Sequence, residues 1–412
     1  MRILFLTHYF PPEVNAPATR TYEHCREWVA AGHEVHVVTG IPSHPAGKPF
    51  AGHRRRWYQH ESIDGIHVHR VWTYLAANRG VARRTANYMS FALSGAWRAW
   101  QLGPFDVAIG TSPQFFCAVA TWLVARLRGR PWVFELRDLW PESIAAVGAL
   151  TPRSAPMRWL ERLELRLYRD AAAVACLTRS FERSLAARGV DETKLHFVPN
   201  GIVPEFWSRA DRESTRDRLG VSNRDVLLSY VGTTGMAHGL ELLLDAMASL
   251  RARAPEVRLL IVGDGAELET LRSMAAERRL SNVRFTGLVA RADIPSLLAA
   301  SDIMLVTLRR SAVFKTVLPS KLFEAMAAAR PIVLGVEGEA RDTLIDAGAG
   351  IAVPPGDAAA LADAVCRLAR DPGLRTAMGE AGLAYVQREY SRRVWAARYL
   401  ALLETVAVAP AG

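Results

Sequence analysis

The chain has 412 residues, more than one hydrophobic core usually organises, so its length favours two domains. Half of the residues are hydrophobic and 22% are charged, a balance that excludes fibrous and disordered proteins. The net charge of +10 indicates an anionic partner, which nucleic acid, a phospholipid surface or a phosphorylated small molecule would satisfy. The arginine pairs are not interleaved with aromatic residues along a strand, so we expect no nucleic-acid partner.

The cysteine pattern and the first apolar run bear on the cell compartment. The 4 cysteines are scattered without a paired spacing, as reduced thiols of a cytoplasmic protein would be. The apolar run at 3–6 is too short for a signal peptide, and no uncharged apolar stretch is long enough to span a bilayer. We therefore expect a cytoplasmic protein, either soluble or peripheral on the inner face of the cytoplasmic membrane.

Short apolar runs alternate with helical segments in the first half, a rhythm typical of a parallel sheet with helices on both faces. The expected strands are 3–6, 35–39, 66–71, 107–110, 132–136, 173–177 and 196–198. The expected helices are 18–31, 81–100, 115–127, 157–168 and 180–188.

The same rhythm resumes in the second half, after a proline- and charge-rich stretch. The expected strands are 226–231, 258–262, 283–286, 303–306, 331–335 and 351–353, and residues from 358 onward are expected to be helical. The sequence thus predicts an α/β protein with two Rossmann-like domains. We place them at 1–198 and 225–385, joined by a linker at 199–224, with a C-terminal helix at 386–412 crossing back to the first domain.

Glycine turns follow two expected strands of the second domain. Gly232-Thr233-Thr234-Gly235 offers backbone N–H groups and the positive end of a helix to a diphosphate, and the threonine hydroxyls add donors. Gly263-Asp264-Gly265 repeats this geometry one strand later, so we expect the two turns to be neighbours. An ordinary βα turn explains either one alone, whereas two together favour a phosphate-bearing ligand.

Another candidate phosphate contact opens an expected helix at 319–327. Pro319 suits the first turn and Ser320 lies near the cap. Lys321 then lies where a cation opposes the helix dipole unless an anion is bound, which indicates a phosphate clamp. Glu324, one turn further, can accept hydrogen bonds from a ribose diol. The alternative is a surface helix that carries a Lys/Glu pair.

Charged residues of the first domain follow the strand expected at 132–136. Asp138 can orient or deprotonate an acceptor hydroxyl, and Arg137 can bind a phosphate or pair with Glu135. A structural salt bridge explains these charges equally well. In the loop and opening turn of the first helix, Asn15 and Arg20 are further candidates, Arg20 as an anion contact.

The helix expected at 81–100 has basic residues at one end and aromatic residues beyond them. Such a helix can lie in a membrane interface and receive a lipid-linked acceptor. Core packing of an amphipathic helix is the alternative, and the sequence favours it slightly.

Six segments taken together carry a family resemblance: 2–13, 32–35, 136–143, 198–201, 263–265 and 319–324. With them the chain resembles the retaining family 4 glycosyltransferases, in particular the O-antigen, colanic-acid and exopolysaccharide branch that includes N-acetylfucosaminyl transferases. This resemblance implies a GT-B fold, in which two Rossmann-like domains with parallel sheets face each other across a cleft. It also implies a nucleotide-sugar donor in the C-terminal domain, an acceptor in the N-terminal domain, and no metal or cofactor.

By that similarity the glycine turn at 232–235 faces the diphosphate and sugar, Lys321 the phosphates, Glu324 the ribose, and the segment 287–289 the base. The motifs and the resemblance together give the donor-binding candidates Gly232, Thr233, Thr234, His238, Gly263, Gly265, Leu288, Ser320, Lys321 and Glu324. They give the acceptor-binding candidates Asn15, Arg20, Arg137 and Asp138, and the catalytic candidates Asp138, Lys321 and Glu324.

The chain departs from the family pattern at three positions. Thr316 stands where the usual motif has a glutamate, and Thr233 and His238 stand in place of the usual arginine and lysine. We therefore expect Lys321, together with Lys315 and Arg310, to supply more of the positive charge around the phosphates.

The expected activity is that of a retaining glycosyltransferase in cell-surface polysaccharide biosynthesis (O-antigen, capsule or exopolysaccharide). It would move a hexose or N-acetylaminohexose from a nucleotide diphosphate sugar to a lipid-linked or growing glycan. The alternatives are a GT-B epimerase or phosphorylase, or a non-catalytic scaffold that binds anionic lipid. An oxidoreductase is less expected, because Pro11-Pro12 follows the first strand where a glycine motif should stand.

Overall fold

The computed structural model describes residues 1–43, 47–75, 81–139, 154–207 and 211–408, and the chain divides into two compact units. The first unit is Met1–Asn200 together with the segment that begins at Arg392, and the second unit is Gly201–Ser391. Residues 201–224, expected as part of a linker, are therefore counted with the second unit, and so are 386–391.

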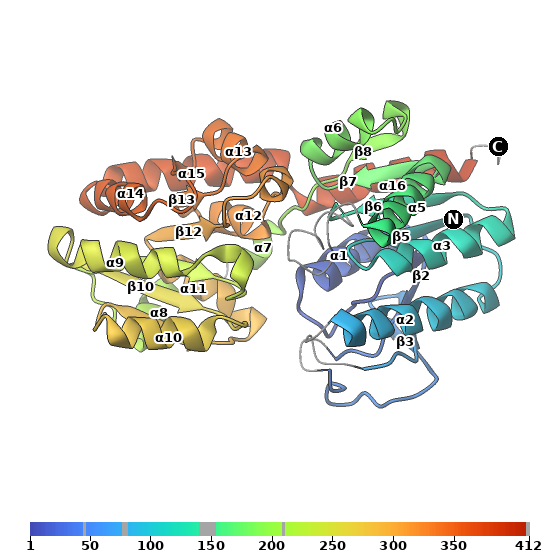
Figure 1. Ribbon diagram of the computed structural model, residues 1–412, viewed down its shortest axis with the longest axis horizontal. Coiled ribbons are helices and arrows are strands. Elements are labelled where there is room, and N and C mark those ends of the chain that lie inside the picture. Colours follow the sequence, from blue (N-terminus) through green and yellow to red (C-terminus); the bar gives the residue numbers. More distant parts are fainter. Residues whose placement is uncertain (44–46, 76–80, 140–153, 208–210, 409–412) are drawn as a thin grey trace. The chain divides into compact units, whose positions relative to one another are not determined.

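The first unit contains an eight-stranded sheet (Figure 1). Its strands, in the order β3-β4-β2-β1-β5-β6-β7-β8, are parallel except for the antiparallel pair β3 and β4. The bounds are β1 (Arg2–Leu6), β2 (Glu34–Thr39), β3 (Tyr58–Ile63), β4 (Ile66–Val71), β5 (Val107–Thr111), β6 (Trp132–Leu136), β7 (Ala173–Cys176) and β8 (Leu195–Phe197).

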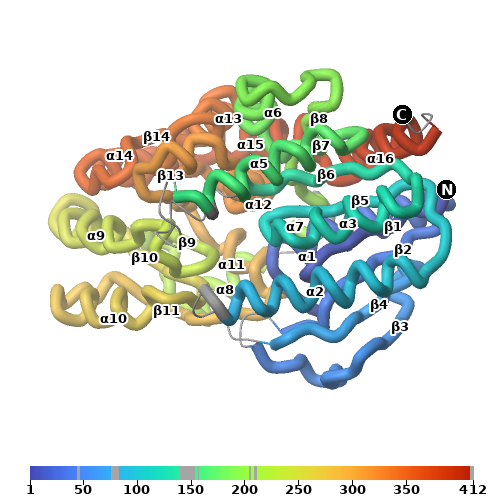
Figure 2. The backbone as a smooth tube through the Cα atoms, turned by 45° about the vertical axis from the view of Figure 1, so that its right-hand side comes forward, coloured from blue at the N-terminus to red at the C-terminus, as the bar shows by residue number. Residues whose placement is uncertain are grey.

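Helices cover both faces of this sheet, as apolar residues on both faces of its strands require. Residues of α2, α3, α5 and α6 share one core with the sheet, and residues of α1 and α16 share the core on the other face. Figure 2 shows α2 and α3 side by side along the sheet. The bounds are α1 (Ala16–Ala30), α2 (Val81–Gln101), α3 (Phe115–Arg128), α5 (Ala155–Asp170), α6 (Arg179–Ala187), η1 (Glu192–Lys194) and α16 (Arg392–Val408).

The second unit contains a six-stranded parallel sheet in the order β11-β10-β9-β12-β13-β14. Its strands are β9 (Val226–Val231), β10 (Val257–Val262), β11 (Val283–Gly287), β12 (Ile303–Thr307), β13 (Ile332–Gly335) and β14 (Gly350–Ala352). When the strands are numbered in chain order within the unit, their order in the sheet is that of the Rossmann fold. The strand order reverses between β9 and β12. Ligands of such sheets bind beyond the carboxyl ends of the strands at that reversal.

The helices of the second unit follow the strands on both faces, and α9, α10 and α14 share one core with the sheet. The longer helices are α8 (Arg212–Leu219), α9 (Glu241–Arg253), α10 (Leu268–Glu277), α11 (Ile294–Ala300), α12 (Ser320–Ala327), α13 (Glu339–Ala347), α14 (Ala358–Arg370) and α15 (Pro372–Glu389). The short ones are α7 (Pro204–Trp207), η2 (Met236–His238), η3 (Arg291–Asp293) and η4 (Val313–Thr316).

Candidate functional site

The candidate donor site lies in the second unit where β9 and β12 end. His238, in η2 just after β9, is tied to the end of β12 by two contacts. The Thr307 hydroxyl donates to the His238 carbonyl at 2.9 Å, and His238 Nδ1 lies 3.4 Å from the Thr307 carbonyl oxygen. These contacts fix the loop after β9 at the reversal of strand order.

The two glycine turns pack directly on each other, as the sequence predicted. Gly232 has φ +145° and Gly263 has φ +129°, backbone conformations that side chains disfavour. A Cβ atom on Gly263 would lie 2.0 Å from the Gly232 carbonyl oxygen, and one on Gly265 would lie 2.6 Å from the Thr234 carbonyl oxygen. Glycine is therefore needed at both Gly263 and Gly265 for the backbones to approach.

Most N–H groups of the turns are used within the protein. Gly265 donates to its neighbour Asp264 Oδ1 at 2.7 Å. Within the described part of the chain, the backbone N–H groups of Thr233, Gly235 and Asp264 have no acceptor, so these amides are the donors of the two turns left for a phosphate. Three others donate to backbone carbonyls: Gly232 to Val262 (2.8 Å), Thr234 to Asp264 (3.1 Å) and Gly263 to Gly287 (2.9 Å).

Lys321 brings its ammonium group from the first turn of α12 to the first glycine turn. Its Nζ donates to the Tyr230 hydroxyl at 2.7 Å and lies 4.5 Å from the centre of that ring. A Cβ on Gly232 would lie 2.0 Å from Lys321 Cε, so the absent side chain is what admits the lysine. The Tyr230 hydroxyl in turn donates to the Thr233 carbonyl at 2.7 Å.

The environment of Lys321 shifts the ionisation of the lysine and of its neighbour His238. Burial lowers the pKa of Lys321 to about 8, although the carboxylate of Glu324 acts in the opposite direction. Burial and the lysine charge lower the pKa of His238 to about 4, against the effect of the Thr307 carbonyl. His238 is therefore neutral near pH 7 and does not replace the missing cation of the family pattern.

The two threonines of the turn have different surroundings. Thr233 is exposed, whereas Thr234 is fully buried, and its Oγ1 has no hydrogen-bond partner among the residues that the structure describes. A buried hydroxyl without a partner costs free energy, so it suits a position that a ligand or a water completes. The exposed Thr233 hydroxyl is open to solvent.

The remaining donor candidates lie on or near these elements. Ser320 is the first residue of α12, and Pro319, rather than Ser320, occupies the N-cap position. Glu324 lies one turn further and is partly buried. Leu288 follows β11 directly and is 75% exposed.

The two cations expected to assist Lys321 are engaged elsewhere. Arg310 and Lys315 both pair with Glu337, at 3.2 Å and 3.1 Å respectively. Thr316, at the glutamate position of the family motif, donates its hydroxyl to the Val313 carbonyl at 2.8 Å. Lys321 is therefore the lysine that the structure brings to the glycine turns.

Arg20, in the first unit, is built into the core. Its Nε lies 3.2 Å from Glu135 Oε2, and both side chains are buried. Its remaining donors reach the carbonyls of Val198 at 2.8 Å and Pro199 at 2.6 Å. These contacts give Arg20 a structural role in the first unit and leave its guanidinium engaged within the protein, in place of the anion contact expected from the sequence.

Arg137 belongs to the same charged group. Its Nη1 lies 3.9 Å from Glu135 Oε1 and donates to the Pro17 carbonyl at 3.3 Å. Burial lowers the pKa of Arg137 to about 10, so it stays a cation at neutral pH. Arg137 therefore also has a structural role beside Glu135, whose Oε1 accepts from the Thr111 hydroxyl at 3.1 Å.

Asp138 and Asn15 lie at the carboxyl end of the same sheet. Ser112 Oγ accepts from the backbone N–H groups of Arg137 at 2.8 Å and Asp138 at 3.3 Å, which fixes the start of the loop. The rest of that motif, 140–143, lies outside the described residues. Asn15 Oδ1 caps α1 by accepting from the Ala18 N–H at 2.9 Å. Its Nδ2 has no partner within the described ranges and can still donate.

Sequence reasoning missed Tyr230 and Thr307, which hold Lys321 and His238. One signal was available for Tyr230: a tyrosine inside a buried strand needs a partner for its hydroxyl. Nothing in the local sequence marks Thr307, because it ends an ordinary apolar strand.

The two doubly wound sheets define an α/β protein with two Rossmann-like domains. Residues 15–201 match the family model described as a glycosyl transferase 4-like domain, and residues 211–384 match the model of glycosyl transferases group 1. The chain thus belongs to the group 1 and 4-like glycosyltransferases.

Individual relatives agree with this assignment. The chain is 29% identical over 348 residues to the putative colanic acid biosynthesis glycosyl transferase WcaI of Escherichia coli, which covers 82% of this chain and 84% of the relative. It is 34% identical over 250 residues to the phosphatidyl-myo-inositol mannosyltransferase of Mycobacterium leprae, covering 60% of this chain and 61% of that protein.

Solved structures share the fold across nearly the whole chain. The Anabaena protein HepE, solved in complex with UDP, matches with a TM-score of 0.73 at 18% identity, covering 98% of this chain and all of that one. The lipopolysaccharide glycosyltransferase WaaG matches with a TM-score of 0.71 at 19% identity, covering 96% of this chain and 99% of that one. The fold is therefore GT-B. Among the described residues, no helix has the length and apolar character to cross a bilayer.

Proposed function

We propose that this glycosyltransferase retains the anomeric configuration of its donor. It moves a hexose or N-acetylaminohexose from a nucleotide diphosphate sugar to a lipid-linked or growing glycan of a cell-surface polysaccharide. The observation that carries the proposal is the Lys321 ammonium at the side-chain-free Gly232. A cation in the first turn of a helix is unfavourable by itself and favourable beside a bound diphosphate. A colanic-acid transferase among the relatives and the UDP complex of HepE support this reading.

The transfer breaks the bond between the sugar C1 and the diphosphate oxygen and forms a bond between C1 and the acceptor oxygen. The acceptor proton passes to the leaving diphosphate, so no nucleophile of the protein is needed. Negative charge grows on the diphosphate as the bond breaks. Lys321 and the N–H groups of Thr233 and Gly235 stabilise that charge. Tyr230 keeps the lysine in place through its hydroxyl.

The pKa of Lys321 gives the proposal a pH signature. With a pKa of about 8 in the unliganded protein, Lys321 carries its proton below that pH and loses it above. A bound diphosphate favours the charged form, so its affinity is full below pH 8 and falls as the pH rises through that value. Calorimetric titration with UDP, GDP and dTDP between pH 6.5 and 9.5 measures this. Lys321→Met should bind more weakly and lose the pH dependence.

The activity test measures nucleoside diphosphate released from UDP-, GDP- and dTDP-sugars with and without a membrane lipid extract. We expect release that depends on the extract and a product whose anomeric configuration, read by NMR, equals that of the donor. Lys321→Met should lower kcat/KM by about 10²–10³. Lys315→Met is the matched control, because its ammonium is exposed and pairs with Glu337 rather than lying at the glycine turns, and it should keep the activity. Equal loss in both variants contradicts the role of Lys321.

The same experiment separates the alternative activities. An epimerase or a phosphorylase acts on its sugar without a lipid-linked acceptor, so activity in the absence of extract would favour it. A scaffold that only binds anionic lipid would show no turnover of any donor. Inversion of the anomeric centre would reject the retaining mechanism while leaving glycosyl transfer intact.

A surface of the first unit supports a membrane-bound acceptor. Phe91 of α2 is buried in the core, as expected if α2 is an amphipathic helix that packs on the sheet. The opposite side of α2, however, exposes large apolar side chains. Arg84, Arg126 and Arg130 are exposed on or beside these helices. We define the aromatic surface as Met89, Leu93, Trp97 and Trp100 of α2, Leu123 and Leu127 of α3, and Trp159 of α5. Apolar side chains edged by arginines suit an interface with anionic lipid.

Sedimentation with vesicles tests this surface. We expect binding to phosphatidylglycerol vesicles that phosphatidylcholine does not reproduce. A double variant Leu93→Glu/Trp97→Glu should weaken it at least tenfold, because both side chains are about two-thirds exposed or more, at 71% and 66%. Ile345→Glu, at 57% exposure on α13 of the second unit, is the control. If both variants bind like the unaltered protein, the surface does not contact lipid.

A further inference from the structure

Two histidines and a glutamate gather on one face of the first sheet, in the unit that does not contain the glycine turns. Glu34 and His36 are two residues apart on β2, so their side chains share a face. His67 on β4 stands directly opposite His36 in the parallel register, and their rings stack with centroids 4.8 Å apart. The ligand atoms of the three residues all lie within 4.8 Å of one another. We call these three residues the His–Glu cluster.

The cluster runs from the interior to solvent. His36 is buried, His67 is partly buried, and Glu34 is exposed. A metal ion would reach His36 from the side of Glu34.

A second layer of contacts orients the buried imidazole. His36 Nδ1 lies 2.9 Å from His69 Nε2, and the Tyr58 hydroxyl lies 3.0 Å from His69 Nδ1. In the tautomer in which His36 donates its Nδ1–H to His69, its Nε2 carries a lone pair for a metal ion, which would lie between this nitrogen and Glu34 Oε1, the two atoms being 2.7 Å apart without it. Metal-binding histidines are held in this way, by a partner on the nitrogen that does not bind the metal.

The guanidinium of Arg2 contacts two of the atoms that a metal ion would use. Arg2 Nε lies 3.1 Å from His36 Nε2 and 3.3 Å from Glu34 Oε1. The guanidinium is also anchored by Nη1, which donates to the Pro104 carbonyl at 2.8 Å. Because the Arg2 side chain is partly exposed, it can turn toward solvent and release both atoms to a metal ion. Arg2 is thus a competitor for the position that a metal would take.

We propose that Glu34, His36 and His67 form a binding site for a divalent transition metal, with Zn²⁺ as the best match. Two imidazoles and one carboxylate are typical ligands of Zn²⁺, and water completes a tetrahedral shell. Tetrahedral ligands at about 2.1 Å from zinc stand ~3.4 Å apart, so the side chains must close by roughly 1.4 Å at most. Rotation of the exposed Glu34 and the partly buried His67 achieves this. The bound metal joins β2 to β4 and stabilises the first unit, independently of glycosyl transfer.

The experiment uses the full chain without an affinity tag, stripped with chelator and titrated calorimetrically with ZnCl₂. We expect about one Zn²⁺ per chain and a higher unfolding temperature with the metal. Tetrahedral absorption bands on adding Co²⁺ report the ligand geometry. Glu34→Gln and His67→Gln should each weaken binding at least tenfold. His196→Gln, on β8 at the opposite edge of the same sheet, is the matched control and should bind normally.

Arg2→Met gives an independent test, because removing the competing guanidinium should tighten Zn²⁺ binding several-fold. Circular dichroism of every variant checks that it is folded. The proposal is overturned if no Zn²⁺ binds, if binding survives in both Glu34→Gln and His67→Gln, or if Arg2→Met leaves the affinity unchanged or lowers it.

Discussion

Gly232 is the glycine of the candidate donor site whose side chain would meet Lys321. Its φ of +145° disfavours any side chain, and a Cβ would lie 2.0 Å from Lys321 Cε. We expect Gly232→Ala to displace the lysine, weaken nucleoside diphosphate binding at least tenfold, and lower the free energy of unfolding by about 1–3 kcal/mol. Calorimetry and urea unfolding measure the two effects. Gly356→Ala is the control, since Gly356 also has positive φ, at +85°, but has open space around it.

The same clash predicts an energetic coupling between the two residues. In a Lys321→Ala background the obstructing Cε is gone, so Gly232→Ala should cost at least about 1 kcal/mol less than in the unaltered chain. Additive free energies of unfolding in the double variant would show that backbone strain, rather than the lysine, sets the cost. The double-mutant cycle thus measures directly whether Lys321 lies over the turn in solution.

The sequence predicts part of this site at the level of single residues. Lys321 was identifiable because its charge opposes a helix dipole, and the glycine turns because they follow apolar strands. The contacts of Arg20 with Val198 and Pro199 could not be identified in this way, because the residues that they join lie near opposite ends of the long segment that makes up most of the first unit. Whether an arginine near a predicted site binds a ligand or the core depends on such long-range partners, which local patterns do not contain.

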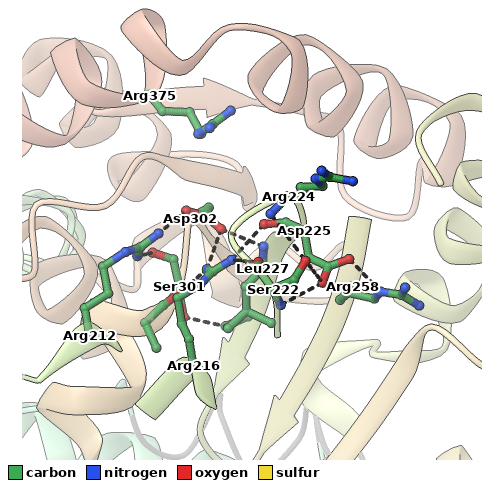
Figure 3. Close-up of polar contacts among 12 residues, drawn as sticks. Arg212, Arg216, Ser222, Arg224, Asp225, Leu227, Arg258, Ser301, Asp302 and Arg375 are labelled. Atoms are coloured by element: carbon green, nitrogen blue, oxygen red, sulfur yellow. Dashed lines mark hydrogen bonds and ion pairs between the residues drawn. The ribbon is translucent and has the colours of Figure 1, made fainter. Parts of the chain in front are cut away.

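Among the elements of the second unit, α8 is attached to the sheet through one aspartate (Figure 3). Asp302 Oδ2 accepts from Arg216 Nη1 at 2.9 Å and from the Leu227 N–H at 2.8 Å, and Arg212 pairs with the other oxygen. Arg216 also donates to the carbonyls of Ser222 and Asp225, so one guanidinium closes the turn between α8 and β9. This network explains why residues 212–219 form an element of the second unit rather than a free linker.

Asp302→Asn should therefore destabilise the second unit by about 3 kcal/mol, because it leaves a buried guanidinium without its counter-charge. Burial by itself would raise the pKa of Asp302, but the Leu227 N–H and the two arginines lower it below its ordinary value. The stabilisation is thus complete above the ordinary carboxyl range and is lost as the pH falls through the lowered pKa. Urea midpoints at pH 7 should differ between variant and parent and converge in acid. Asp363→Asn, in an exposed pair with Arg253, should leave the midpoint unchanged.

One strand was absent from the sequence-based expectation although its signal is present. Asp64 and Gly65 connect β3 to β4, with φ of +49° and +79°, and Ile63 pairs with Ile66 across this two-residue loop. Asp-Gly between alternating apolar residues is a strong hairpin signal. The strand escaped notice because β3 is an exposed edge strand, Tyr58–Ile63, with few apolar residues, and the βαβ rhythm does not include antiparallel pairs.

At the scale of the whole molecule, the sequence predicts the doubly wound pattern of both halves, because parallel strands buried on two faces are continuous apolar runs. Every strand expected in the second half has a counterpart among β9 to β14. The boundary between the units is set by contacts instead. The chain leaves the first unit after Asn200 and returns to it at Arg392, so the two units are joined by two crossings of the chain.

The second crossing makes the stability of the first unit depend on the end of the chain. Trp28 of α1 donates its Nε1–H to the Ala396 carbonyl at 3.0 Å, and Arg392 pairs with Glu23 at 2.9 Å. Tyr399 and Leu403 are fully buried in the core that α16 shares with the sheet. A chain that ends at Ser391 should lose more than about 4 kcal/mol from the first unit alone, since each buried side chain of this size contributes roughly 1.5–3 kcal/mol.

Hydrogen exchange read by mass spectrometry locates this loss, because it reports the protection of each strand separately. We expect faster exchange in β1, β2 and β5 of the shortened chain and unchanged exchange in β9, β10 and β12. If the shortened chain is too unstable to isolate, Leu403→Ala should show the same pattern at about 2–5 kcal/mol, with partly exposed Val394→Ala as the control. Equal loss of protection in both units would mean that they unfold together. Loss confined to the first unit would mean that α16 stabilises the first unit alone, although it follows the donor-site unit in the sequence.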